Sequence, residues 1–183
     1  MISHIRSMLR YGVMAALAIA YGLPVSTAWS QTSAPTLDDP TIVAIFDAAN
    51  TYDMETGSLA VRKGHSKAVR DFGAMLVRDH RNVRQQGRDL AKSLKVTPTP
   101  PRDFALAEAH VQAMRSLRSV KGRAFDRAFL KQEVDFHNAV LDAVTHTLLP
   151  ATQNAQVKDL ETKVAPAFVA HRDRAQSLLD EQK

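Results

Sequence analysis

The sequence contains no cysteine, which excludes disulfide bonds, thiolate metal ligands and dithiol redox chemistry. Aromatic residues make up only 6% of the chain, so it offers few platforms for stacking nucleic-acid bases, and we predict no nucleic-acid partner. No segment alternates apolar and polar residues convincingly, and no Asn-Gly or Asp-Gly turn occurs. The sequence therefore predicts a domain without β-sheet that is stabilised by packing alone.

A membrane-spanning run is also missing. The apolar stretch Tyr11–Leu23 is shorter than the about 20 residues that a spanning helix needs. Arg6 and Arg10 precede this stretch, and small residues follow it up to Ala28 and Ser30. This layout is typical of a secretory signal peptide, and we predict cleavage after Ala28 or Ser30. The predicted location is the bacterial periplasm, either free or associated with the envelope.

The domain plan that follows is a signal peptide over residues 1–30, a linker over 31–38 and one helical bundle over 39–183. Residues 1–30 hold two arginines and no acid, so their removal lowers the formal charge from +5 to +3. The 45% hydrophobic content is sufficient for a core in a single domain.

Capping and breaking residues divide this domain into helices. Asp39 and Pro40 predict an N-cap and first position, Gly64 a C-cap, and Ser66 the next N-cap, so the first two helices form an antiparallel hairpin. Pro150 is expected to end the fourth helix. The predicted helices span residues 39–63, 66–94, 103–119, 123–149 and 152–181. The predicted fold class is all-α, a four-helix bundle with one extra short helix.

Helical periodicity predicts a polar layer within the bundle core. Each long helix has an apolar face, and titratable residues lie on or beside these faces at similar heights. The layer consists of three histidines and two glutamates, with one aspartate flanking it: Glu55, Asp79, His80, Glu133, His137 and His171. The other three histidines of the predicted bundle, His65, His110 and His146, are expected to be solvated.

Two interpretations of this layer remain open. Imidazole and carboxylate groups are the usual ligands of zinc, copper or iron, so the layer is a candidate site for a divalent metal or a small ligand. The same groups can instead pair with one another and fix the register of the helices. A buried polar layer is costly unless its members pair or bind something, so the size of this layer weakens the register interpretation without excluding it.

The helix that carries His80 also has a continuous basic face. Its members are Arg78, Arg81, Arg84, Arg88 and Lys92, on the side away from the apolar face. One interpretation is a surface for anionic envelope lipid or an acidic protein, and the other is a solvated face.

Four segments resemble an exported bacterial ferritin-like family that is known as a domain of unknown function. They are Asp53–Leu59 (DMETGSL), Val69–His80 (VRDFGAMLVRDH), the Phe125-Asp126…His137 spacing and Pro166…His171. The resemblance covers residues 41–178 and implies a ferritin-like four-helix bundle in the periplasm or envelope. It also implies that Glu55, Asp79, His80, His137 and His171 occupy the recurrent polar positions of the family.

The resemblance supplies no activity. Di-iron members of the wider ferritin-like group use Glu-x-x-His steps, and this sequence contains none. We therefore predict a non-catalytic binding protein that holds a divalent metal or small ligand in the layer. The alternative is a structural or interaction protein of the envelope, and a metal-dependent oxidoreductase ranks last.

Overall fold

The structure, a computed structural model, describes residues 37–182, which belong to one compact unit. The predicted signal peptide and most of the predicted linker lie outside the described residues. All regular secondary structure in residues 37–182 is helical, as the sequence predicts. None of the described helices is both long and apolar enough to cross a membrane.

The helices largely follow the predicted boundaries. The fourth is an exception, because its α-helical part ends at Ala143 and a π-helical turn follows. Pro150 does not end this helix, since it lies inside a short further one. The elements are α1 (Asp39–Lys63), α2 (Lys67–Ser93), α3 (Ala105–Ser119), α4 (Gly122–Ala143), the π-helical turn η2 (Val144–Leu148), α5 (Leu149–Ala151) and α6 (Ala155–Asp180).

Side-chain caps define the starts of three long helices. Asp38, Ser66 and Asn154 accept hydrogen bonds from backbone N–H groups in the first turns of α1, α2 and α6. Asp39, which we predicted as the first cap, lies one residue inside the helix. Its carboxylate instead accepts the backbone N–H of Gln153 at 3.0 Å and so ties the start of α1 to the start of α6.

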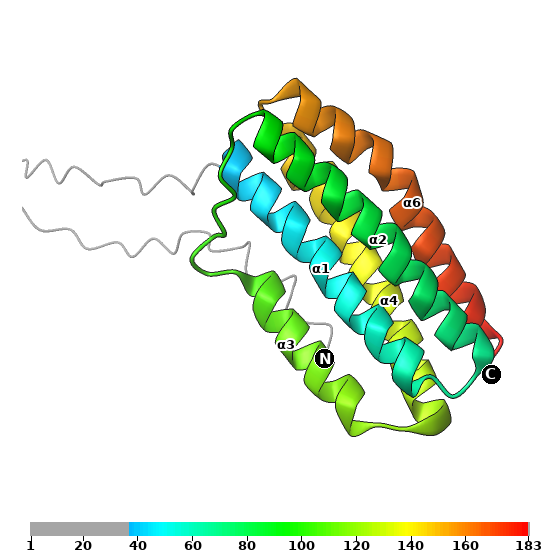
Figure 1. The fold of residues 1–183 in the computed structure, drawn as a ribbon. Helices are drawn as coiled ribbons and strands as arrows, with labels where there is room; N and C mark the ends of the chain where they lie inside the picture. Colours follow the sequence, from blue (N-terminus) through cyan, green and yellow to red (C-terminus); the bar gives the residue numbers. More distant parts are fainter. Residues whose placement is uncertain (1–36, 183) are drawn as a thin grey trace, which may run out of the picture. The chain divides into compact units, whose positions relative to one another are not determined.

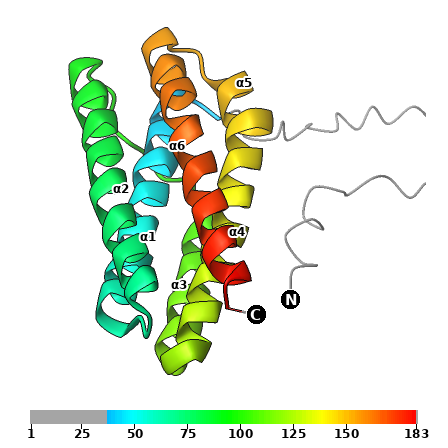
Figure 2. The ribbon, with the colours of Figure 1, turned by 90° about the vertical axis from the view of Figure 1, so that its right-hand side faces the viewer.

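Four long helices, α1, α2, α4 and α6, form a bundle in the described part of the chain (Figure 1). The tight turn after α1 makes α1 and α2 an antiparallel hairpin, and α4 and α6 form a second antiparallel pair (Figures 1 and 2). The connection from α2 to α4 runs back along the bundle and contains α3, which lies beside α1 and α4. The extra helix is therefore part of a long crossover.

Two glycines set the contact between α1 and α2. A Cβ on Gly57 would lie 2.8 Å from the Gly73 carbonyl oxygen, and a Cβ on Gly73 would lie 2.6 Å from the Gly57 oxygen. Only glycine at both positions allows the two backbones to approach this closely. The contact turns Asn50 and Asp53 of α1 into the core, where both are buried.

Candidate metal centre

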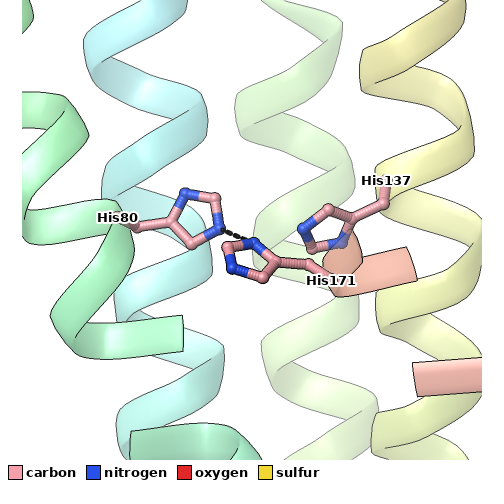
Figure 3. A group of neighbouring side chains, drawn as sticks. All are labelled: His80, His137 and His171. Carbon is pink, nitrogen blue, oxygen red and sulfur yellow. Dashed lines mark hydrogen bonds between the residues drawn. The ribbon is translucent and has the colours of Figure 1, made fainter. Parts of the chain in front are cut away.

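Three histidines from three helices meet in the middle of the bundle. His80 comes from α2, His137 from α4 and His171 from α6, and all three side chains point toward one another (Figure 3). They are 0%, 1% and 4% exposed, so water is nearly excluded from the cluster. One nitrogen from each ring lies within 4.8 Å of the other two. The structure thus brings together the three predicted histidines.

The Nδ1 atom of His80, which points away from the other two histidines, is held by a residue of α1. The amide of Asn50 donates its N–H to the carbonyl of Phe46 at 2.8 Å, which leaves its oxygen facing His80 Nδ1 at 2.9 Å. Nδ1 of His80 must therefore carry the proton and donate. In the neutral ring, Nε2 then has a lone pair, and this nitrogen faces the cluster.

The Nε2 atom of His171, which points away from the other two histidines, is held by a residue of α2. Nε2 of His171 lies 3.2 Å from a carboxylate oxygen of Asp79, an acceptor, so this nitrogen carries the proton. The inner nitrogen, Nδ1, lies 3.1 Å from Nε2 of His80. With both rings neutral, two unprotonated nitrogens face each other at this distance.

His137 also has one nitrogen that is held by an acceptor and one that faces the other two histidines. Its Nδ1 donates to the carbonyl of Glu133 at 2.9 Å, one turn earlier on α4. Its Nε2 is buried and has no hydrogen-bond partner among the described residues. A buried nitrogen without a partner costs free energy unless it binds something.

Two buried carboxyl groups adjoin the histidines. Asp53 of α1 places Oδ2 at 3.4 Å from His80 Nε2, and Glu133 of α4 places Oε2 at 3.7 Å from His137 Nδ1. One ligand atom each from Asp53, Glu133 and His137 lie within 4.8 Å of one another. Glu133 Oε2 has no hydrogen-bond partner in the described part of the chain. His137 therefore belongs to two adjoining groups of donors.

Burial keeps the histidines neutral. It lowers the pKa of His80 far below its ordinary value, and His137 and His171 lower it further. Burial also lowers the pKa of His137 to about 4, against the opposing effect of the Glu133 carbonyl. It lowers the pKa of His171, although Asp79 acts in the opposite direction. Neutral imidazole is the form that binds metals.

Burial has the opposite effect on the pKa of the two acids. It raises the pKa of Asp53 well above its ordinary value, and the adjacent charge of Glu133 raises it further. Burial raises the pKa of Glu133 to about 7, while hydrogen bonds with Asp53 and Thr56 lower it. Two buried carboxylates side by side resist simultaneous ionisation unless a cation joins them.

An apolar side chain closes the cluster on one side. The ring of Phe168 on α6 stacks on His80 with centroids 5.4 Å apart and an interplanar angle of 5°. The same ring meets His137 edge-on at 6.3 Å. Such a wall fixes the ring orientations and keeps the local dielectric low.

The structure differs from the sequence analysis at Glu55 and His110. Glu55 lies on the surface, not in the polar layer, because the core face of α1 is turned toward Asn50 and Asp53. His110 is not solvated, since its side chain is 9% exposed, donates from Nε2 to Glu55 at 2.7 Å and stacks on Tyr52. The sequence signal that we missed is that Asp53 follows Phe46 by seven residues, two helical turns on the same face.

The predicted basic face of α2 lies on the surface, and part of it is paired. Arg88 makes a two-pronged ion pair with Asp47, with one contact of 2.9 Å. Arg84 donates to the Thr51 hydroxyl at 3.1 Å. Arg78 likewise donates to Asp79 at 3.0 Å. The two other members, Arg81 and Lys92, are exposed and have no ion-pair partner within residues 37–182.

These features define a helical bundle with a buried cluster of three histidines and two carboxyl groups. The chain belongs to the DUF4142 family, described as a domain of unknown function, whose family profile matches residues 25–178. No curated protein matches the chain. The fold is similar to that of CopM in the Cu(II)-bound form, with a TM-score of 0.60 and 13% sequence identity. The similarity covers 79% of this chain and 98% of CopM.

Proposed function

We propose that the chain binds one divalent transition-metal ion at this centre, without catalysis. The ligands are His80 Nε2, His137 Nε2, His171 Nδ1 and Asp53 Oδ2. The observation that carries the proposal is that one nitrogen of each histidine faces the other two rings in a buried layer, while the other nitrogen of each ring faces an acceptor oxygen. His137 Nε2 has no hydrogen-bond partner among the described residues, whereas a network that served only helix register would supply one.

The distances suit a small tetrahedral ion. Zinc–nitrogen bonds of 2.0–2.1 Å place neighbouring ligand atoms roughly 3.3 Å apart. The His80–His171 separation of 3.1 Å and the His80–Asp53 separation of 3.4 Å are close to this length. Imidazole and carboxylate donors suit Zn²⁺ and Cu²⁺, and the fold similarity to CopM in its Cu(II)-bound form supports testing copper.

A binding role fits the donor set better than catalysis does. With Asp53 as the fourth ligand beside the three histidines, a tetrahedral ion would have no open position for a substrate, as in structural zinc sites. Phe168 and the bundle core also surround the histidines.

Metal titration of the purified protein tests the proposal. We expect one Zn²⁺ or Cu²⁺ per chain and an increase in thermal stability, because an ion at 1,000 times its Kd stabilises the native state by about 4 kcal/mol. His80→Ala and His171→Ala should abolish both effects. His146→Ala is the matched control, since His146 is an exposed histidine paired with Asp142. If no ion binds and no metal raises the melting temperature of the wild type, the metal-binding proposal fails, and lower melting temperatures of the two core variants than of the control would then indicate a register role.

We also propose export to the periplasm, with cleavage after Ala28 or Ser30. The support is the basic start, the apolar stretch Tyr11–Leu23 and the small residues that follow. Mass spectrometry of the protein recovered from cell fractions tests this proposal. An intact N-terminus in the cytoplasmic fraction would contradict it.

The ferritin-like assignment is part of the same proposal. Its support is the connection between α2 and α4, which runs back along the bundle, since ferritin-like bundles contain one long crossover. The absence of Glu-x-x-His from the sequence separates this chain from the di-iron members of that group.

A further inference from the structure

A pocket adjoins the centre on the side of the two carboxyl groups. It lies among α1, α3 and α4 and has a volume of about 20 Å³, room for about one water molecule. The buried side chains of Asp53, Thr56 and Glu133 form its inner wall, and Ala109 and His110 of α3 lie on its outer side. Asp53 and Glu133 therefore line the pocket and also adjoin the histidines.

The other side of the centre carries Asp79 of α2 next to His171 of α6. Asp79 is 32% exposed there, but it contacts the outer, protonated nitrogen of His171. The imidazole ring itself then separates Asp79 from the inner nitrogens. On the pocket side, by contrast, Asp53 Oδ2 lies 3.4 Å from the inner nitrogen of His80. An ion that passes the carboxyl groups meets the lone pairs directly.

The two halves of α3 are held differently. Its C-terminal half contributes Met114 and Leu117, the two buried residues of the helix, to the core, and Lys63 donates to the carbonyls of Leu117 and Arg118. Its N-terminal half has no buried residue, and no side chain caps its start. The preceding segment, residues 94–104, is largely irregular and contains three prolines.

One histidine fastens the N-terminal half. His110 stacks on Tyr52 with ring centroids 4.1 Å apart and donates to Glu55 at 2.7 Å, both on α1. Segments with few buried apolar contacts open locally at low free-energy cost, so the stack and the hydrogen bond of His110 influence how often the half-helix lifts. The carboxylate of Glu55, which accepts the hydrogen bond from His110, is exposed and attracts cations.

We propose that the metal ion reaches and leaves the histidine centre through the pocket among α1, α3 and α4, and that the N-terminal half of α3 is the lid that His110 closes. This inference rests on the proposed metal-binding function. The lid changes the rates of binding and release together, and it leaves the equilibrium affinity unchanged, because His110 is not a ligand.

The test measures Zn²⁺ loading by stopped-flow and Zn²⁺ release into excess chelator, with the full chain and two opposite variants. His110→Ala removes the stack and the hydrogen bond and should speed both rates roughly fivefold to thirtyfold. Ala109→Phe fills the pocket and should slow both rates. Neither variant should change the Kd, and His146→Ala should match the wild type in all three quantities.

Two results would overturn the route. One is equal rates in the wild type, His110→Ala and Ala109→Phe, which would show that the ion enters elsewhere. The other is faster release with weaker equilibrium binding in His110→Ala, which would show that His110 stabilises the centre instead of closing a lid. If the wild type binds no Zn²⁺ at equilibrium, the metal-binding function itself fails, and the titration separates that case from failure of the route alone.

Discussion

The inner nitrogens of His80 and His171 lie 3.1 Å apart, and each ring's other nitrogen is held by an acceptor on a neighbouring helix. Asn50 orients the first ring and Asp79 the second. Such partners of metal-ligating histidines fix the tautomer and the ring direction. The two rings are therefore already oriented as the proposed metal site requires.

Asp79 should act as a positioning residue for His171. Asp79→Ala should weaken Zn²⁺ or Cu²⁺ binding by about 10-fold to 100-fold, since it removes the acceptor that orients the ring. Asp79→Asn keeps an acceptor oxygen and should recover part of the loss. Competition with a chelator of known affinity measures both variants.

The matched control is Asp142→Ala. Asp142 lies 3.1 Å from His146 in an exposed pair of the same chemistry, remote from the layer. The Asp142→Ala substitution should leave the affinity for Zn²⁺ or Cu²⁺ unchanged. Equal affinities in Asp79→Ala and the wild type would contradict the positioning role.

The stability of the metal-free protein should depend on pH through Glu133. Burial raises the pKa of Glu133 to about 7, so the native state holds a proton that the unfolded chain releases near pH 4.5. This stabilisation is complete below pH 4.5 and is lost as pH rises through 7. Glu133→Gln removes the loss, so its stability relative to the wild type should rise by up to about 1.4 kcal/mol for each pH unit between 4.5 and 7.

Urea unfolding in the presence of a chelator, at several pH values, measures this difference. Asp135→Asn is the control, because Asp135 is exposed on the same helix and pairs with Lys131. Its stability difference from the wild type should be flat across the range. A flat difference for Glu133→Gln as well would show that Glu133 titrates normally.

Local sequence signals were sufficient to predict the helices. Ser66 was predicted as a cap from its position before a periodic segment, and its hydroxyl accepts the Val69 N–H. Pro150 was misleading because a proline ends a helix only where it interrupts an established turn. Here the π-helical turn Val144–Leu148 comes first, and Pro150 then lies in the first turn of α5, where its missing N–H costs nothing.

The site was predictable on three helices and not on the first. His80, His137 and His171 lie within strongly apolar faces, so their direction followed from periodicity. The face of α1 is less distinct, and the choice between Asp53 and Glu55 depends on how the helix is rotated. That rotation is set by the close contact between Gly57 and Gly73, a tertiary feature that periodicity does not contain.

Gly57→Ala tests this contact. In an unconstrained helix the change would stabilise by about 1 kcal/mol through helix propensity. Here the new Cβ would lie 2.8 Å from the Gly73 carbonyl, so we expect a net loss of roughly 1–3 kcal/mol and weaker metal binding as α1 moves away. Thermal unfolding and metal titration measure the two effects. A more stable Gly57→Ala protein would show that α1 and α2 separate without cost.

The basic face of α2 gives the last prediction. Arg88 is paired with Asp47 and Arg84 is held by the Thr51 hydroxyl, so the exposed cations of this face without an ion pair among the described residues are Arg81 and Lys92. We expect weak, salt-sensitive binding to vesicles that contain anionic lipid, because exposed cations attract such surfaces and salt screens the attraction.

Replacing both Arg81 and Lys92 by Gln should abolish the vesicle binding, as measured by co-sedimentation. Lys131→Gln with Lys163→Gln is a control of equal charge, since these lysines pair with Asp135 and Asp159 on other helices. It should reduce binding less. The specific role would be refuted if the two double variants bound equally, because net charge alone would then govern the interaction. Equal binding of the wild type to anionic and neutral vesicles would show that the face is only solvated.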